Sequence, residues 1–199
     1  MKANGAAALH SSPMTLDEWG AMDEDEPGEL VDGFLVEEEV PDGVHEVVVG
    51  FLIHALTGSL RPLGAFVLGS EAKLAVGPRR GRKPDAWVYL PGRAPAARGV
   101  IRTPPDIAIE VVTPTARDAR RDRVEKMDDY AAAGVRFYWI VDPQLRSIEI
   151  FERVNDGRYF RATAVCEGLC THVPGVPQLS LDVDALWAEV DRLVAAAGE

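Results

Sequence analysis

The sequence predicts an α/β or mixed α+β fold, in which helices flank a mixed β-sheet. Three observations favour this class. Ile107 to Val112 is almost continuously apolar, as a central strand buried on both faces should be. Val44 to Leu60 carries apolar residues at helical spacing, and Phe137 to Val141 and Ile148 to Arg153 are typical of further strands. A chain of 199 residues with 47% hydrophobic content can bury one core of ordinary size.

The N-terminal part predicts a lead, a short helix and a hairpin. Residues 1–13 contain one lysine and no long apolar core, so we expect a disordered lead and not a secretory signal. Residues 14–199 are expected to form one domain. The capping-box pattern from Thr15 to Glu18 predicts a helix start. Asp32-Gly33 between two short apolar segments predicts a hairpin turn.

The rest of the chain alternates strands, turns and helices. The Gly/Pro-marked basic segment 77–83 is expected to be a loop, and 91–104 a long connection. A helix is expected from Ala116 to Ala133, with Gly134 ending it. The other expected elements are strands at 65–68, 72–76, 85–90 and 159–165 and a helix at 181–197.

The charge of the chain is acidic but unevenly distributed. The net charge is −11, which does not favour non-specific affinity for nucleic acid. The first fifty residues hold thirteen acidic residues and one basic residue, whereas residues 79–102 hold seven basic residues and one acidic residue. The basic stretch is either a solvated loop or a local phosphate-binding surface, and both interpretations stay open.

Composition also bears on location. No run of about 18 apolar residues occurs, so we expect no transmembrane helix and no membrane partner. Cys166 and Cys170, with His172 nearby, are too few ligands for a closed zinc site. We expect two ordinary thiols in a reducing compartment, and therefore a cytoplasmic protein.

Two carboxylates on apolar segments point to chemistry. Asp85 begins one predicted strand and Glu110 lies near the end of another, and a lone carboxylate on a hydrophobic strand is costly to bury unless it is paired. If these strands pair, both carboxylates converge at one edge of the sheet, and the carbonyl of Val111 can add a third oxygen. Hard cations such as Mg²⁺ or Mn²⁺ prefer such ligands. Lys126, on the following helix, can orient a water or stabilise developing phosphate charge.

Other residues keep two interpretations. Glu110 can instead form a structural ion pair with Lys126 or an arginine. Glu29 is a further site carboxylate or a surface strand residue, and His45 is a site residue or a polar residue at a helix N-terminus. The aromatic residues Tyr130, Tyr138 and Trp139 are expected in the core.

The order of these residues resembles a known family. Pro84-Asp85, followed 25 residues later by Glu110-Val111-Val112, is similar to the PD-(D/E)XK nuclease core. More narrowly, the chain from about Thr15 to Arg153 resembles the Uma-type restriction endonucleases. The other matching phrases are Glu29-Leu30-Val31-Asp32-Gly33, His45 opening the long helix, Ile109-Glu110-Val111-Val112-Thr113-Pro114, Lys126 with Tyr130, and Gly134-Val135 through Tyr138-Trp139-Ile140-Val141-Asp142-Pro143.

The resemblance implies a restriction endonuclease-like fold and a Mg²⁺-dependent endonuclease that hydrolyses DNA phosphodiester bonds. Asp85 and Glu110 would hold the metal, with Val111. Val112 stands where the superfamily has its lysine, and the resemblance implies that Lys126 takes that role from the helix. A literal Glu71-Ala72-Lys73 also occurs, but it precedes Asp85 and is out of order.

Two function classes follow from these residues. The first is the metal-dependent nuclease. The second is a catalytically inactive module that keeps the fold and binds nucleic acid or protein. A homodimer is expected from the acidic N-terminal residues and the apolar strands beyond the core, and it would suit cutting both strands of a duplex.

Overall fold

The computed structural model describes residues 12–22, 28–36 and 40–198. Most of the expected disordered lead, 1–11, lies outside the described residues. The helical elements are α1 Leu16–Ala21, α2 Gly43–Leu60, η1 Arg61–Leu63, α3 Ala116–Arg120, η2 Arg121–Lys126, α4 Met127–Ala133 and α5 Val183–Ala197. The strands are β1 Glu29–Val31, β2 Phe34–Val36, β3 Phe66–Gly69, β4 Leu74–Gly77, β5 Arg80–Arg82, β6 Ala86–Tyr89, β7 Ile107–Val111, β8 Phe137–Asp142, β9 Ser147–Arg153, β10 Tyr159–Val165, β11 Leu169–Cys170 and β12 Leu181–Asp182.

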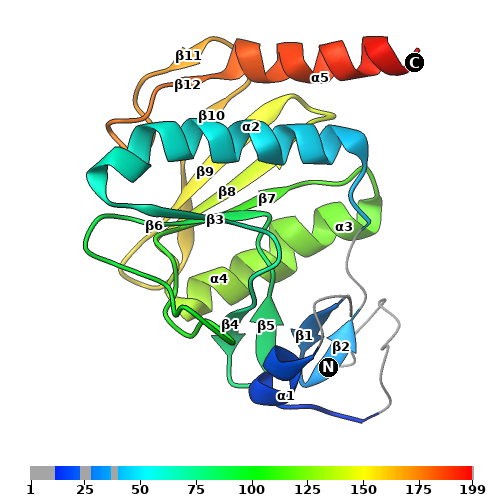
Figure 1. Cartoon of the computed structure of the whole chain (residues 1–199), viewed down its shortest axis with the longest axis vertical. Helices are drawn as coiled ribbons and strands as arrows, with labels where there is room; N and C mark the ends of the chain where they lie inside the picture. Colours follow the sequence, from blue (N-terminus) through cyan, green and yellow to red (C-terminus); the bar gives the residue numbers. More distant parts are fainter. Residues whose placement is uncertain (1–11, 23–27, 37–39, 199) are drawn as a thin grey trace.

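A six-stranded mixed sheet forms the centre of the molecule, in the order β10-β9-β8-β7-β6-β3 (Figure 1). Among the strands described in this sheet, β7 and β8 are the pair that runs parallel, and the helix α3-η2-α4 makes the crossover between them. β7 is buried along its whole length, as its apolar run predicts. The predicted mixed sheet with flanking helices is therefore confirmed.

Two apolar layers cover the two faces of this sheet. Alternate strand residues such as Ile109 and Trp139 face α2 and α5 and form the larger core with them. The residues between them, such as Ala108 and Tyr138, face the other side and pack with Tyr130 of α4. The period of two along each strand thus decides which layer a side chain joins. Glu110, which follows Ile109, belongs to the face that α4 covers.

A second sheet lies beside the first in the order β2-β1-β5-β4. The predicted hairpin is present, and its turn residues Asp32 and Gly33 have φ of 54° and 87°. The expected loop at 77–83 is wrong, because β5 pairs with both β1 and β4. The small β11-β12 sheet was also not predicted, and residues Leu181–Asp182 belong to it and not to the C-terminal helix.

The long helix α2 is strongly apolar. By length and composition alone, the segment Gly43–Leu63 could cross a membrane, although the sequence analysis predicted no transmembrane helix. Its buried residues Val48, Leu52, Leu56 and Leu60 pack in the main core. Packing against the sheet and α5 accounts for the apolar face of this helix (Figure 1).

Gly81 allows the second sheet to pack against α1. Its backbone faces the ring of Trp19, and an added Cβ would lie 2.1 Å from Trp19 Cζ3. The Trp19 side chain is fully buried beside Leu30 and Leu35. We predict that Gly81→Ala lowers the free energy of unfolding by about 1–3 kcal/mol, because an overpacked core must shift. Urea denaturation measures this change.

Gly50→Ala is the matched control for Gly81→Ala. Gly50 lies within α2, and no atom lies within 4 Å of its added Cβ. The substitution should leave stability unchanged or raise it by up to about 1 kcal/mol, because alanine favours helix more than glycine does. Equal effects of both substitutions would contradict the packing argument.

Candidate active site

Asp85 and Glu110 come together because β6 and β7 are antiparallel neighbours. The register that pairs Ala86 with Ile109 places Asp85 beside Glu110. Asp85 Oδ2 accepts a hydrogen bond from the backbone N–H of Val111 at 2.7 Å, which fixes the carboxylate against the end of β7. The two acidic residues therefore share one edge of the sheet.

Lys126 reaches the same place from the helix. Its Nζ lies 2.7 Å from Glu110 Oε2 and 3.1 Å from Asp122 Oδ1. The Glu110 side chain is 1% exposed and that of Lys126 is 8% exposed, so the pair is almost removed from water. Asp122 and Lys126 belong to the π-helical segment η2, a local widening that is frequent at functional sites.

Tyr130 completes the surroundings of Glu110. Its hydroxyl donates to Glu110 Oε1 at 2.5 Å, so both oxygens of this carboxylate are engaged. The ring packs in the core, as the sequence predicts, at 5.2 Å from the ring of Tyr138. Asp122, Lys126 and Tyr130 follow one another at intervals of four residues in the sequence. Residues at this spacing lie on one face of a helix, so the sequence contained a signal that Asp122 and Tyr130 are neighbours of Lys126.

Burial and crowding control the charges of this group. Burial raises the pKa of Glu110 well above its usual value, and the nearby carboxylates of Asp85, Asp122 and Glu29 act in the same direction. Burial opposes the charge of Lys126, but the carboxylates of Asp122 and Glu110 outweigh it and hold the pKa of Lys126 well above its usual value. Lys126 therefore keeps its proton at neutral pH.

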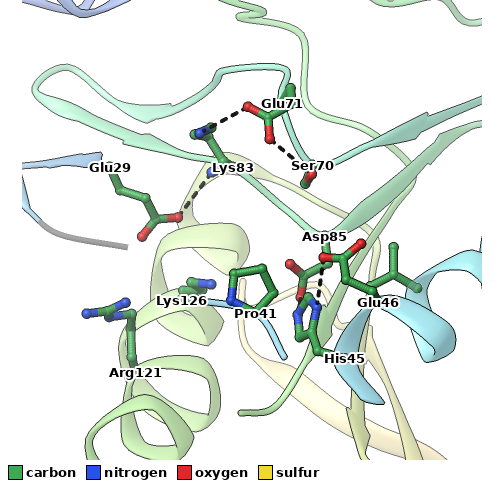
Figure 2. Close-up of a pocket in the computed structure, with 11 residues that line it drawn as sticks. Glu29, Pro41, His45, Glu46, Ser70, Glu71, Lys83, Asp85, Arg121 and Lys126 are labelled. Carbon is green, nitrogen blue, oxygen red and sulfur yellow. Dashed lines mark hydrogen bonds and ion pairs between the residues drawn. The ribbon is translucent and has the colours of Figure 1, made fainter. Parts of the chain in front are cut away.

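His45 is the second partner of Asp85. It lies in the first turn of α2, where its backbone N–H donates to the N-cap residue Asp42 at 2.8 Å. His45 Nε2 lies 3.2 Å from Asp85 Oδ2, and Figure 2 shows the two side chains facing each other. The structure thus brings His45 to the site, where the sequence left its role open.

A cavity of about 110 Å³ opens over these residues (Figure 2). Its walls include His45, Asp85, Lys126 and Glu29, and also three residues that the sequence did not single out for this site: Lys83, Arg121 and Glu46. Glu71 lines it as well, but Lys73 donates to the carbonyl oxygens of Trp19 and Met22 at the end of α1. The literal Glu71-Ala72-Lys73 therefore does not place its lysine in this cavity.

Glu29 is held by a second charged group. Its Oε2 lies 2.6 Å from Arg82 Nη1, and its Oε1 accepts from the backbone N–H of Lys83 at 3.1 Å. Burial raises the pKa of Glu29, but Arg82, Lys126 and the Lys83 N–H outweigh burial and lower it to about 2. Arg82 also binds Asp129 Oδ2 at 2.6 Å, so it joins β1 to α4. Glu29 lines the cavity as a charged partner of Arg82.

The donor chemistry of the site fits a hard divalent cation. Glu110 and Asp122 contact the one ammonium of Lys126, and the carboxylates of Asp85 and Glu29 also act on its charge. This excess of negative charge is what a cation would neutralise. In the described part of the chain, no three His, Cys, Asp or Glu side chains are close enough to hold a metal by themselves. A metal would therefore draw on Asp85, Glu110 and water, as Mg²⁺ commonly does.

A mixed sheet with flanking helices and a carboxylate pair on neighbouring strands defines a protein of restriction endonuclease-like fold. The chain belongs to the Uma2 family, whose model carries the description "Putative restriction endonuclease" and matches residues 15–184. No curated protein sequence matches the chain.

The solved structures that match this chain include the following two. The crystal structure of a protein from Anabaena variabilis ATCC 29413, titled a putative nuclease belonging to DUF820, has a TM-score of 0.72 at 19% identity and covers 89% of this chain and 99% of that chain. The type IIG restriction endonuclease BpuSI has a TM-score of 0.42 at 15% identity, covering 80% of this chain and 18% of that chain. The first likeness agrees with the fold described above.

Arg82 is expected to dominate the stability of the contact between the second sheet and α4. Arg82→Met leaves buried Glu29 without its paired arginine and leaves Asp129 with Arg80 alone, so the free energy of unfolding should fall by about 3–5 kcal/mol. Arg80→Met is the control, because Arg80 also binds Asp129 but its side chain is 35% exposed. That change should cost about 1 kcal/mol or less. Similar urea midpoints for both variants would contradict this account.

Proposed function

We propose that the protein is a divalent-metal-dependent endonuclease that hydrolyses DNA phosphodiester bonds. The observation that carries the proposal is the meeting of Asp85, just before β6, with Glu110 of β7 and Lys126 of η2, beside the cavity that Asp85 and Lys126 line. Family membership supports the same reaction class. Mg²⁺ or Mn²⁺ would be held by Asp85 and Glu110, with the Val111 carbonyl as a third oxygen, and would supply Lewis-acid stabilisation and a more acidic bound water.

The residues of the chain have separate roles in this reaction. Lys126 keeps its proton, so it acts as a fixed positive charge that stabilises the developing charge on the phosphate or orients the attacking water. It is therefore not a general base. Asp85 is oriented by the Val111 N–H and by His45, so its carboxylate is fixed before substrate arrives. Tyr130 and Lys126 fix Glu110 in the same way.

The test is cleavage of supercoiled and linear DNA with Mg²⁺ or Mn²⁺. Lys126→Met should lower the cleavage rate by about 10² or more, the scale of losing one electrostatic stabiliser. Metal affinity, measured by calorimetry, should persist, because an ammonium does not ligate a cation. Asp85→Asn should lose both. Arg120→Met is the matched control on the same helix, since the Arg120 side chain is 66% exposed.

A double variant separates a loss of catalysis from a loss of folding. Lys126→Met leaves Asp122 and Glu110 without their buried cation, so Lys126→Met combined with Asp122→Asn removes one charge of each sign. This double variant should fold and bind Mn²⁺ but cleave slowly. Cleavage at the wild-type rate would reject the role of Lys126.

One observation favours a second candidate, a catalytically inactive module that binds nucleic acid or protein. Both oxygens of Glu110 are engaged by Lys126 and Tyr130, so a metal must compete for them. If the wild type cuts no DNA with either metal, and Mn²⁺ causes no thermal shift that Asp85→Ala removes, this module becomes the better account.

We also propose that the protein works as a cytoplasmic homodimer. Cys166 is exposed and neither it nor Cys170 forms a disulfide in the described structure, which suits a reducing compartment. Two copies would present two sites to the two strands of a duplex. Light scattering at micromolar concentration should give twice the chain mass of 21.6 kDa, and the monomer mass alone would reject the dimer.

A further inference from the structure

A second cavity, of about 240 Å³, is also lined by His45. It is lined mostly by apolar side chains, among them Val44 at the start of α2, Val112 and Pro114 after β7, Pro143 after β8 and Val190 of α5. Asp42, Thr113 and Gln144 add polar groups at its walls. An apolar space with a few polar groups is the usual character of a binding site for a small organic group.

The two cavities share one residue of the candidate site. His45 lines both of them, and its Nε2 faces Asp85 in the first. Val112 and Thr113 of the second cavity follow Glu110 by two and three residues on the same segment. A ligand in the second cavity would therefore contact the same histidine that faces Asp85 in the first.

The two cavities differ in size and lining as the two parts of a nucleotide differ. The first, of about 110 Å³, is the smaller and is lined largely by charged groups, which suits a phosphate. The second, of about 240 Å³, is roughly twice as large and has a more apolar lining, which suits a base. Lys126 lines the smaller cavity and pairs with Glu110, and both side chains are almost removed from solvent.

The first cavity combines exposed acidic side chains with basic ones. Glu46 and Glu71 line it with side chains 64% and 77% exposed, Lys83 Nζ lies 3.5 Å from Glu71 Oε2, and Arg121 lines it as well. A duplex has one phosphate charge per about 1.7 Å of axis, twice the density of a single strand, so the exposed carboxylate of Glu46 repels a duplex more than a single strand. A single strand can also extend one phosphate into a recess while its base turns away from its neighbours.

We propose that the second cavity binds an unpaired base of the substrate strand, and that single-stranded or locally unpaired DNA is the substrate class. This inference rests on the proposed nuclease function. The base enters between the apolar side chains of Val44, Val112 and Val190, and Asp42, Thr113 and Gln144 are placed to contact its polar edge. The adjoining phosphodiester then lies in the first cavity, beside Asp85 and Lys126.

The first test compares DNA forms. A fluorescein-labelled oligonucleotide of mixed sequence is tested as a single strand, as a duplex and as a set of single strands with one abasic residue moved along the chain. Cleavage is followed with Mn²⁺, and binding is followed by anisotropy in Ca²⁺. The single strand should have a kcat/KM at least about tenfold above that of the duplex, and one abasic position beside the cut should lower it about tenfold.

The second test narrows the cavity. Val44→Phe adds bulk at its wall, whereas Val47→Phe makes the same change one helical turn away, at a residue that lines neither cavity. Both valines are half-buried against the core, so the two variants should have similar melting temperatures. Only Val44→Phe should lower cleavage of the intact single strand by about tenfold, and it should not lower cleavage of the strand that lacks the critical base.

Gln144→Ala gives an independent variant if Val44→Phe fails to fold, because Gln144 is exposed and lies outside the core. It should weaken the preference among bases beside the cut. A duplex cut as well as the single strand, or an abasic scan without a sensitive position, overturns the inference and leaves the proposed nuclease intact. Base-dependent binding of single strands without cleavage by any metal supports the base site and rejects the nuclease.

Discussion

The structure depends on how the carboxylate of Glu110 is accommodated inside the sheet. A carboxylate on a fully buried central strand is tolerated only when cations and hydrogen-bond donors surround it. Lys126 and Tyr130 supply these partners from one side of the crossover helix, and Asp122 holds the other side of the ammonium. The same contacts fix the helix against β7, so the contacts of Glu110 determine both the packing of this layer and the charge of the site.

A second buried charge group extends this constraint to the N-terminal sheet. Arg82 of β5 binds Glu29 of β1 and Asp129 of α4, and Asp129 is the residue before Tyr130. The small sheet is therefore tied to the helix that carries Lys126. Glu29 also contributes to the raised pKa of Lys126, so a residue paired with arginine still acts on the site through its charge.

The sequence predicts those parts whose signals are local. The apolar run of β7 identifies the central strand and makes the carboxylate of Glu110 stand out within it. Gly134 ends α4 with φ of 90°, as expected. Strand β5 was missed because Arg80-Gly81-Arg82 has the composition of a loop. Its burial depends on Glu29 and Asp129, which lie about fifty residues away along the chain. Such long-range ion pairs leave no periodic pattern. By contrast, the four-residue spacing of Asp122, Lys126 and Tyr130 was present in the sequence.

The position of Val112 connects the site with the second cavity. In the superfamily pattern that the sequence resembles, a lysine stands two residues after the glutamate, and here that position lines an apolar space. A lysine at 112 would place a long charged chain beside Val44 and Val190, where burial would disfavour its charge. Because Lys126 brings an ammonium to Glu110 from the helix, position 112 can be apolar without loss of positive charge at the site. The position of Lys126 on the helix therefore leaves the end of β7 available to shape the cavity next to it.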